Sequence, residues 1–243
     1  MESKHVLARV PYHITARPED VAERILVMGD PDRVREASKL LKDVKLASGR
    51  RGFPVYTGFF NGVRVSVAAH GIGGPSAAIV FEELKMLGAE VIVRLGTCGG
   101  LKREIILGSV IVPVGAAYER GGTIGMYVGN TCYPAVPDLD LTLAFERRFR
   151  MDGFRVFRGL VASSDAFHAE EEYSRRWRKL NIIGVEMECA TLFTLARLRG
   201  FRAAAVLMVI DNLEDGTAMK LDEIRDFEEK ALKTALKALT EIK

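Results

Sequence analysis

The sequence predicts an α/β protein in which helices alternate with the strands of a largely buried sheet. Short apolar runs rich in β-branched residues alternate with longer amphipathic stretches, and one run, Ala203–Ile210, is wholly apolar. No internal repeat or Pro/Ser-rich linker interrupts the 243 residues. Because a chain of this length buries roughly 70% of its unfolded surface in one core, we expect a single domain spanning residues 1–243.

The first part of the chain is expected to be an extended arm, followed by alternating strands and helices. The arm takes up about the first dozen residues and ends at Tyr12-His13-Ile14. Asn61-Gly62 lies between two alternating runs, which is the strongest short-range signal for a β-hairpin. In order, we expect strands at Arg24–Gly29, Val55–Phe60 and Val63–Ala69, and helices at Asp32–Leu41 and from Ser76 to about Leu87.

The stretch Val91–Gly100, V-I-V-R-L-G-T-C-G-G, is the most informative part of the chain. Its β-branched start predicts a buried strand, and Arg94 follows while the chain is still apolar, so its guanidinium needs an anionic partner or water. Gly96, Gly99 and Gly100 surround Thr97, which predicts a concave turn with φ > 0 and exposed N–H groups that bind an oxyanion. The alternative is a βα turn with Arg94 in a structural salt bridge.

The second part of the chain continues the alternation. Residues 115–137 form a long turn-rich segment, which is typical of a functional or interface loop. The stretch Ile183–Cys189 is expected to open a helix that continues to Arg199. We further expect strands at Gly108–Val114, Val156–Ser163 and Ala203–Ile210, and helices at Leu139–Asp152, Glu170–Lys179 and over the last 20 or so residues.

Charge and motifs exclude several classes of protein. The balance of 35 basic and 32 acidic residues gives a net charge of only +3, which does not indicate a nucleic-acid partner. The glycines after His70 lack the third position of a dinucleotide fingerprint, and the sequence has no P-loop, no nucleophile elbow and no metal-ligand spacing. We therefore expect no metal and no cofactor.

Cysteine usage and hydropathy suggest a soluble protein of the cytoplasm. Cys98, Cys132 and Cys189 are odd in number and widely spaced, which excludes a disulfide framework. The chain has no charged-then-apolar leader, and its longest apolar run is too short for a membrane span. The absence of glutamine beside 28% charged residues is typical of a thermophile. In a hyperthermophile Cys132 is a candidate for an intersubunit disulfide, and a free thiol is the alternative.

Polar residues gather at or just beyond the predicted carboxyl ends of the strands, the edge of an open α/β sheet where ligands bind. Arg33 lies in the first turn of a helix, where it opposes the helix dipole unless an anion sits beside Gly29; a surface arginine is the alternative. Together these positions indicate an enzyme that acts on a hydroxyl-rich substrate together with phosphate, although each carboxylate alone fits a capping or salt-bridge role equally well. The residues are Gly29, Arg33, His70, Arg94, Thr97, Phe167, Glu186, Glu188 and Asp211.

The chain resembles the hexameric purine nucleoside phosphorylases of the nucleoside phosphorylase I superfamily, and especially archaeal purine-nucleoside/5'-methylthioadenosine phosphorylases. Eight motifs carry the resemblance in the same order, from His13 to the last helix: H-I-T-A, V-M-G-D-P-D-R, R-G-F-x-V-Y-T-G, H-G-I-G-G-P-S, V-R-L-G-T-C-G, S-S-D-A-F, G-V-E-M-E-C-A-T and V-I-D-N. The resemblance implies a central mixed, partly barrel-like sheet flanked by helices. It also implies purine salvage by phosphate-dependent cleavage of the N-glycosidic bond, with orthophosphate as co-substrate.

The resemblance also implies a role for each matching residue. Gly29, Arg33, Arg94 and Thr97 would bind phosphate together with Arg51 of a neighbouring subunit. The nucleoside would contact Phe167, Glu186, Met187 and Glu188, with His13 of the neighbour near the 5' position. Asp211 would be the general acid that protonates purine N7, in a homohexamer built as a trimer of dimers. Arg225 is the nearest candidate for an arginine that assists this acid, but its spacing does not match the family pattern.

Three other readings remain open. A uridine phosphorylase shares the fold but presents a Gln-x-Arg pair for uracil, where this chain has Glu171-Glu172-Tyr173. A hydrolytic nucleosidase would lack the arginines that bind phosphate. A non-catalytic nucleoside-binding protein would bind adenosine without releasing the base. The choice among adenosine, inosine, guanosine and 5'-methylthioadenosine is not fixed by the sequence.

Overall fold

The fold was examined in a computed structural model that describes residues 9–242. Its strands are β1 (Arg24–Met28), β2 (Lys42–Ser48), β3 (Val55–Phe60), β4 (Val63–Ala69), β5 (Val91–Gly100), β6 (Val110–Tyr118), β7 (Val156–Ser163), β8 (Gly184–Glu186), β9 (Arg202–Asn212) and β10 (Thr217–Ala218). Its α-helices are α1 (Pro31–Ser38), α2 (Gly74–Met86), α3 (Gly122–Val128), α4 (Leu139–Met151), α5 (Glu170–Lys179), α6 (Cys189–Arg199) and α7 (Leu221–Glu241). The predicted α/β class is confirmed.

Five strands close on themselves to form a small mixed barrel. β5 pairs with β9 in parallel, β9 with β6 antiparallel, β6 with β7 and β7 with β8 in parallel, and β8 returns antiparallel to β5. The register between β5 and β9 shifts between Cys98 and Gly99, where β9 has one extra residue. β5 also pairs with β1 over its first four residues and with β8 at Gly99 and Gly100. The barrel-like sheet implied by the family resemblance is therefore present.

The remaining long strands extend the sheet from the other edge of β5. β1 is parallel to both β5 and β4, and β3 and β2 follow antiparallel. The predicted hairpin between β3 and β4 is confirmed, since Asn61 and Gly62 have φ values of 49° and 78°, as a tight hairpin turn requires.

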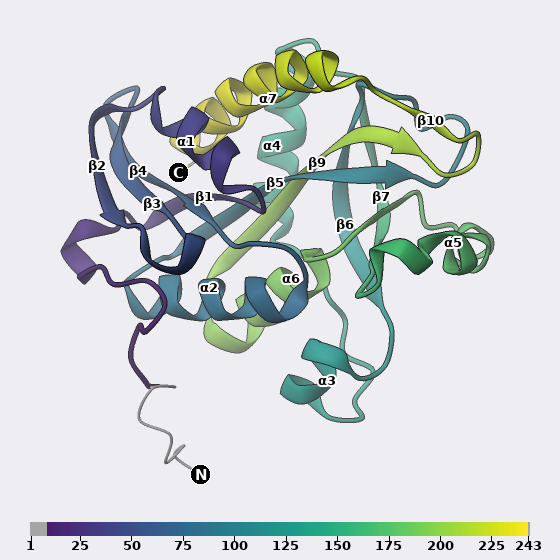
Figure 1. Cartoon of the computed structure of the whole chain (residues 1–243), viewed down its shortest axis with the longest axis horizontal. Helices are drawn as coiled ribbons and strands as arrows, with labels where there is room; N and C mark the ends of the chain where they lie inside the picture. The colour runs from purple at the N-terminus through teal and green to yellow at the C-terminus, as the bar shows by residue number, and fades with distance from the viewer. Residues whose placement is uncertain (1–8, 243) are drawn as a thin grey trace.

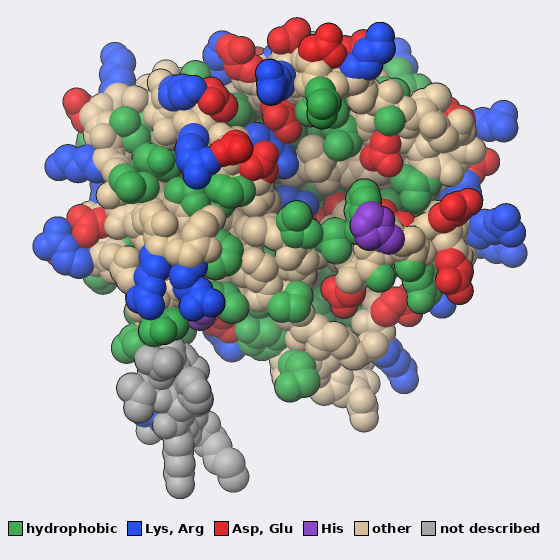
Figure 2. Space-filling view, viewed as in Figure 1, with side chains coloured by type: hydrophobic (Ala, Val, Ile, Leu, Met, Phe, Trp, Pro, Cys, Tyr) green, Lys and Arg blue, Asp and Glu red, His purple; other side chains and the backbone are tan. Residues whose placement is uncertain are grey.

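Helices cover the sheet on both faces (Figure 1). α2 and α6 pack on one face together with α3, whereas α1, α4 and α7 lie on the other. Each face buries its own apolar cluster, around Phe81 and Phe193 on the first and around Phe145 and Phe149 on the second. On the outer surface, Figure 2 shows side chains of both charges spread over the face toward the viewer.

Several sequence expectations were wrong in detail. The glycines of Val91–Gly100 do not form a left-handed turn, because none of Gly96, Gly99 and Gly100 has a positive φ and the strand runs through all three. Their lack of a side chain makes room for neighbours instead, as the site shows below.

Other differences concern short elements. The polar strand β2 and the three-residue strand β8 were not expected, and the loop after β6 contains helix α3. Of the predicted N-terminal arm, residues 1–8 lie outside the described part of the chain. Within residues 9–242, no helix has the length and apolar character needed to cross a membrane.

Candidate active site

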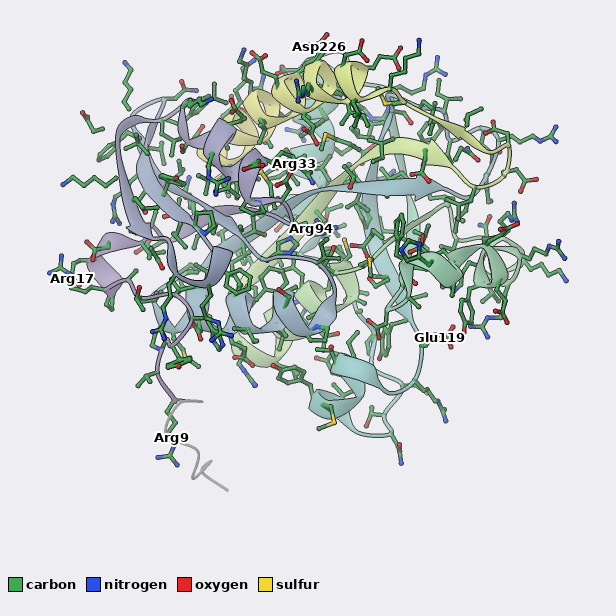
Figure 3. The ribbon with its side chains drawn as sticks, viewed as in Figure 1. Arg9, Arg17, Arg33, Arg94, Glu119 and Asp226 are labelled. Carbon is green, nitrogen blue, oxygen red and sulfur yellow. The ribbon has the colours of Figure 1, made fainter. Side chains whose placement is uncertain are left out.

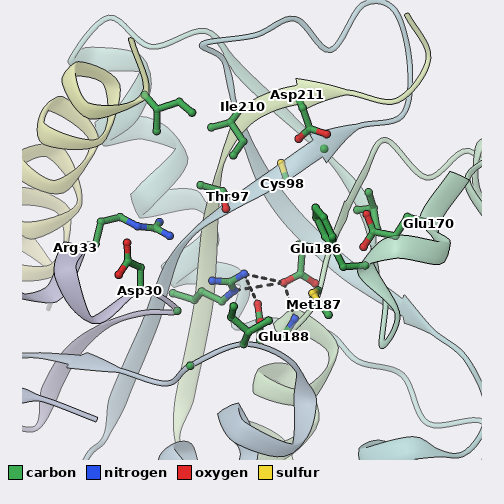
Figure 4. A pocket seen from close by; sticks show the side chains of 18 of the residues that line it. Asp30, Arg33, Thr97, Cys98, Glu170, Glu186, Met187, Glu188, Ile210 and Asp211 are labelled. Carbon is green, nitrogen blue, oxygen red and sulfur yellow. Dashed lines mark hydrogen bonds and ion pairs between the residues drawn. The ribbon is translucent and has the colours of Figure 1, made fainter. Parts of the chain in front are cut away.

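A cavity of about 1060 Å³ opens between the carboxyl end of β1, the second half of β5, the β8–α6 junction and the start of α7. Its walls therefore come from segments far apart in the sequence (Figure 4). Of the predicted site residues, all but His13, Arg51 and His70 line it: Gly29, Arg33, Arg94, Thr97, Phe167, Glu186, Met187, Glu188 and Asp211.

Arg33 lies on one side of the cavity, in the first turn of α1. Asp30 caps this helix by accepting a hydrogen bond from the Asp32 N–H at 2.8 Å, which fixes the turn that carries Arg33. The Arg33 side chain is only 11% exposed, and its Nε and Nη1 atoms have no hydrogen-bond partner among the described residues. Burial lowers the pKa of this guanidinium. A buried cation with unsatisfied donors is a favourable site for an anion.

Arg94 extends from β5 and lies near the centre of the molecule, as does Arg33 (Figure 3). Its Nη2 donates to Glu188 Oε2 at 2.5 Å and to Glu186 Oε2 at 3.2 Å. Burial disfavours the charge of Arg94, but Glu188 and Glu186 outweigh burial and raise its pKa. A Cβ atom at Gly96 would lie 2.3 Å from Arg94 Nη1. The guanidinium therefore lies over Gly96. The salt bridge expected from the sequence as the alternative for Arg94 is present, and because Arg94 also lines the cavity, its position is compatible with an anion site.

The two glutamates at the β8–α6 junction have different surroundings. Glu186 accepts hydrogen bonds from Ser163 Oγ at 2.5 Å and from the backbone N–H groups of Glu188 and Cys189 at 2.8 and 2.9 Å, and its side chain is fully buried. The carboxylate oxygens of Glu186 are therefore occupied by Arg94, Ser163 and the N–H groups at the start of α6. Glu188 accepts one N–H bond, from Gly73 at 2.6 Å, besides its bond from Arg94. The carboxylate of Glu188, which accepts fewer hydrogen bonds than that of Glu186, is thus better suited to hold a ligand.

Asp211 lies on the opposite side of the cavity from Arg33, near the end of β9 (Figure 4). Its carboxylate packs over Gly99, where a Cβ atom would lie 3.2 Å from Oδ2. Burial raises the pKa of Asp211, and within residues 9–242 no hydrogen bond to its carboxylate is found. The eight apolar residues before it therefore have the effect expected from the sequence, because they place the acid in a partly desolvated position.

Some of the side chains that line the cavity were not predicted from the sequence. Glu170, in the first turn of α5, lines the cavity, and burial together with the charge of Asp211 raises its pKa to about 7. Ile224 of α7 lines it as well. His70, expected at the ligand edge, is instead fully buried behind Arg94, with its Nε2 at 3.4 Å from Arg94 Nη1. Burial lowers its pKa, so the imidazole is neutral.

His13 and Arg51 do not line the cavity of their own chain. The Nδ1 atom of His13 lies 2.7 Å from Oε1 of Glu83, a buried acid on α2. Arg51 is exposed in the short 3-10 turn Arg50–Gly52. Neither side chain therefore contributes to the cavity of its own chain. Arg225 is exposed and does not line the cavity either.

The rim of the cavity is partly apolar. Phe167 is 63% exposed at the mouth, and Ile72 from the loop before α2 is 76% exposed. Within the described residues no group of three or more His, Cys, Asp or Glu side chains is arranged to hold a metal ion.

Comparisons with known proteins are consistent across the chain. Residues 23–243 match the sequence profile described as Phosphorylase superfamily. The chain is 35% identical over 242 residues to a guanosine phosphorylase of Halorubrum lacusprofundi, covering 96% of this chain and 99% of the relative. It is 37% identical over 215 residues to a uridine phosphorylase of Thermococcus kodakarensis, covering 83% and 77%, respectively.

A bacterial relative and a solved structure agree with these matches. A DeoD-type purine nucleoside phosphorylase of Roseobacter denitrificans is 34% identical over 214 residues, 87% of this chain and 91% of the relative. The crystal structure of a uridine phosphorylase from Vibrio fischeri superposes with a TM-score of 0.86 at 30% identity, covering 96% of this chain and 98% of that chain.

Proposed function

Because the chain belongs to the phosphorylase superfamily and is a nucleoside phosphorylase, a pentosyltransferase, we propose that its substrates are purine nucleosides. Phosphate would attack the anomeric carbon, giving the free purine and ribose 1-phosphate. With 5'-methylthioadenosine the second product would be the 5-methylthio analogue of that sugar phosphate. One arrangement supports the proposal: Arg33, Arg94 and Asp211 line a single cavity, with Arg33 and Asp211 on opposite sides of it.

The chemistry of the reaction fits this arrangement. Breaking an N-glycosidic bond develops positive charge on the sugar and negative charge on the departing base. Two guanidinium groups beside the N–H groups at Gly29 would hold the phosphate dianion in place as nucleophile. Glu188 would accept hydrogen bonds from the ribose hydroxyls, and Met187 would pack on the sugar. Asp211, whose pKa is raised by burial, would deliver a proton to purine N7.

The preference for a purine rests on two features of the base end. Asp211 supplies an acid that purine N7 requires and a pyrimidine does not use. Phe167 at the mouth offers an aromatic face for the base. The segment after Phe167 carries Glu170 and two further glutamates, and it lacks the Gln-x-Arg pair expected for uracil. A uridine phosphorylase is the second candidate, since relatives with that name match the chain about as well.

A homohexamer is part of the proposal. His13 and Arg51 would complete the cavity of a neighbouring subunit, His13 near the 5' position and Arg51 at the phosphate. The exposed apolar rim at Ile72 and Phe167 supports coverage by a second copy. We also propose a cytoplasmic enzyme that needs orthophosphate as co-substrate and no cofactor.

The proposal is tested with a panel of purine and pyrimidine nucleosides, each assayed for base release with and without orthophosphate. We expect release of purines only when phosphate is present, together with ribose 1-phosphate or its analogue. Equal release in phosphate-free buffer would indicate a hydrolase. Faster phosphorolysis of uridine than of every purine nucleoside would favour the second candidate. Binding of adenosine without any base release would indicate a non-catalytic protein.

A further inference from the structure

Helix α7 contributes a carboxylate to the surroundings of Arg33. Glu228 Oε1 lies 3.2 Å from Arg33 Nε, and the two side chains are 20% and 11% exposed. The two residues are distant in the sequence and come from helices that pack on the same face of the sheet. The contact is thus a tertiary ion pair between largely buried groups.

The position of Glu228 leaves part of the guanidinium free. Glu228 lies beside Nε as an ion-pair partner, and neither Nε nor Nη1, both buried, has a hydrogen-bond partner within residues 9–242. Figure 4 shows the Arg33 side chain extended toward the middle of the cavity. A guanidinium has donors along two edges, so one edge can be held by the protein while the other is offered to a ligand.

Arg33 also has other charged groups near it. The charges of Glu228, Asp30 and Glu188 favour its charged form, whereas Arg94 and burial disfavour it. Asp30 lines the same cavity. Without Glu228, the charges of Asp30 and Glu188 would compete with a bound anion for the guanidinium.

We propose that Glu228 is a positioning residue for the phosphate subsite: its charge holds the Nε side of Arg33 so that the terminal end of the guanidinium faces the incoming anion. This inference rests on the proposed function of Arg33 in binding phosphate. Helix α7 would then contribute to the site twice: Glu228 would hold Arg33, and Ile224, one helical turn earlier, lines the cavity. Nothing in the Arg33 motif itself specifies this partner.

The test measures binding of inorganic phosphate to the purified protein by titration calorimetry, for the wild type and Glu228→Gln. The matched control is Glu229→Gln, the adjacent exposed acid, which pairs with Lys233. We expect Glu228→Gln to weaken phosphate binding on the order of tenfold, the size typical of neighbours in one charge network. Glu229→Gln should bind phosphate as the wild type does.

Kinetics then separate positioning from a general structural role. For Glu228→Gln, the KM for phosphate should rise while the KM for the nucleoside and the melting temperature stay near wild type. Equal rises in both KM values with a lower melting temperature would overturn the proposal. Tighter phosphate binding would overturn it as well, because it would show that the carboxylate only competes with the anion for Arg33.

A double-mutant cycle with Arg33→Lys completes the test. A lysine ammonium is a single charged group, so it has no separate Nε edge that Glu228 could hold while another edge binds phosphate. In that background we expect Glu228→Gln to have little effect on phosphate binding, and an undiminished loss would contradict the proposal. The calorimetric measurement of phosphate binding does not require the enzyme to cleave a nucleoside. A wild type that binds phosphate but does not cleave nucleosides would therefore contradict the proposed function and still test the role of Glu228.

Discussion

Asp211 illustrates how a single residue is given its chemistry by its surroundings. Its carboxylate follows a buried strand and has a raised pKa, as a proton donor near neutral pH requires. We predict that Asp211→Asn lowers kcat for purine nucleosides by about 10²–10⁴-fold, the usual contribution of a positioned general acid. Phosphate binding, measured by calorimetry, should be unchanged. Arg94→Ala should instead weaken phosphate binding and change kcat much less.

A substrate that needs no protonation provides the control for this prediction. A purine nucleoside methylated at N7 already carries positive charge on the base, so its base departs without a proton from the enzyme. Asp211→Asn should cleave this nucleoside at nearly the wild-type rate. A loss of the same size as for the ordinary purine nucleoside would mean that Asp211 does not act as the acid.

Glu170 gives a second prediction at this scale, in the dependence of stability on pH. Burial, with a smaller contribution from Asp211, raises the pKa of Glu170 from 4.5 to about 7. Between these values the folded protein keeps a proton that the unfolded chain has released, so stability falls as the pH rises, by about 3 kcal/mol at most. Glu170→Gln removes this titration.

The measurement compares melting temperatures of the wild type and Glu170→Gln at pH 5 and pH 8. The wild type should lose more stability over this interval than the variant, and most of the loss should occur below about pH 7. Parallel curves for the two proteins would show that Glu170 is ionised throughout and that its environment does not disfavour the charge.

Sequence reasoning identified the residues whose chemistry is unusual for their place in the chain. Arg94 inside an apolar strand and Asp211 after eight apolar residues were found for this reason. Glu228 was missed because a glutamate on an amphipathic helix is an ordinary surface residue in sequence terms. Its contact with Arg33 exists only after α7 packs against α1, and no local pattern encodes that packing.

At the scale of elements, β5 is longer than the sequence predicts. A turn was expected at Gly96–Gly100, but the strand runs from Val91 to Gly100, and its glycines make room for neighbouring side chains. Each makes room for a different group: Arg94 over Gly96, Leu213 and Asp211 over Gly99, and Asn212 and Ile105 over Gly100. A glycine-rich motif alone does not show whether its glycines form a turn or make room for neighbouring side chains.

Gly96→Ala tests this interpretation. The new methyl group would lie 2.3 Å from Arg94 Nη1, so the guanidinium must move. We predict that the KM for phosphate rises by about tenfold or more, since displacement of a positioning group by even 1 Å is costly in such sites. Gly125→Ala is the control, because a Cβ atom there meets nothing within 4 Å. A wild-type KM for Gly96→Ala would contradict the inferred contact.

Short elements were the ones that the sequence did not reveal. β2 is mostly exposed, and its apolar residues Val44, Leu46 and Ala47 are too few and too exposed to give the apolar alternation of a half-buried strand. β8 has three residues and is a strand only because β5 and β7 flank it. Yet β8 closes the barrel and places Glu186 and Glu188 beside Arg94. The part of the fold that assembles the site therefore depends on long-range pairing.

For the whole molecule, the proposed function makes the site complete only when a second copy contributes to it. Arg51 lies outside the cavity of its own chain, but the proposed function requires it at the phosphate of a neighbour. In a two-fold symmetric dimer, the contribution is reciprocal, so each chain supplies Arg51 to the other. Two defective chains can then compensate for each other.

We predict that mixtures of Arg51→Ala and Arg94→Ala chains regain activity that neither variant has alone. In a mixed dimer, one site keeps its own Arg94 and receives Arg51 from its partner, whereas the other site lacks both. With random pairing, half of the dimers are mixed, and about a quarter of all sites are intact. Coexpressed chains assayed at low phosphate should therefore reach about a quarter of the wild-type rate. Activity no higher than the average of the two parents would mean that each cavity works with the arginines of its own chain, and Arg51 would then have no part in binding phosphate.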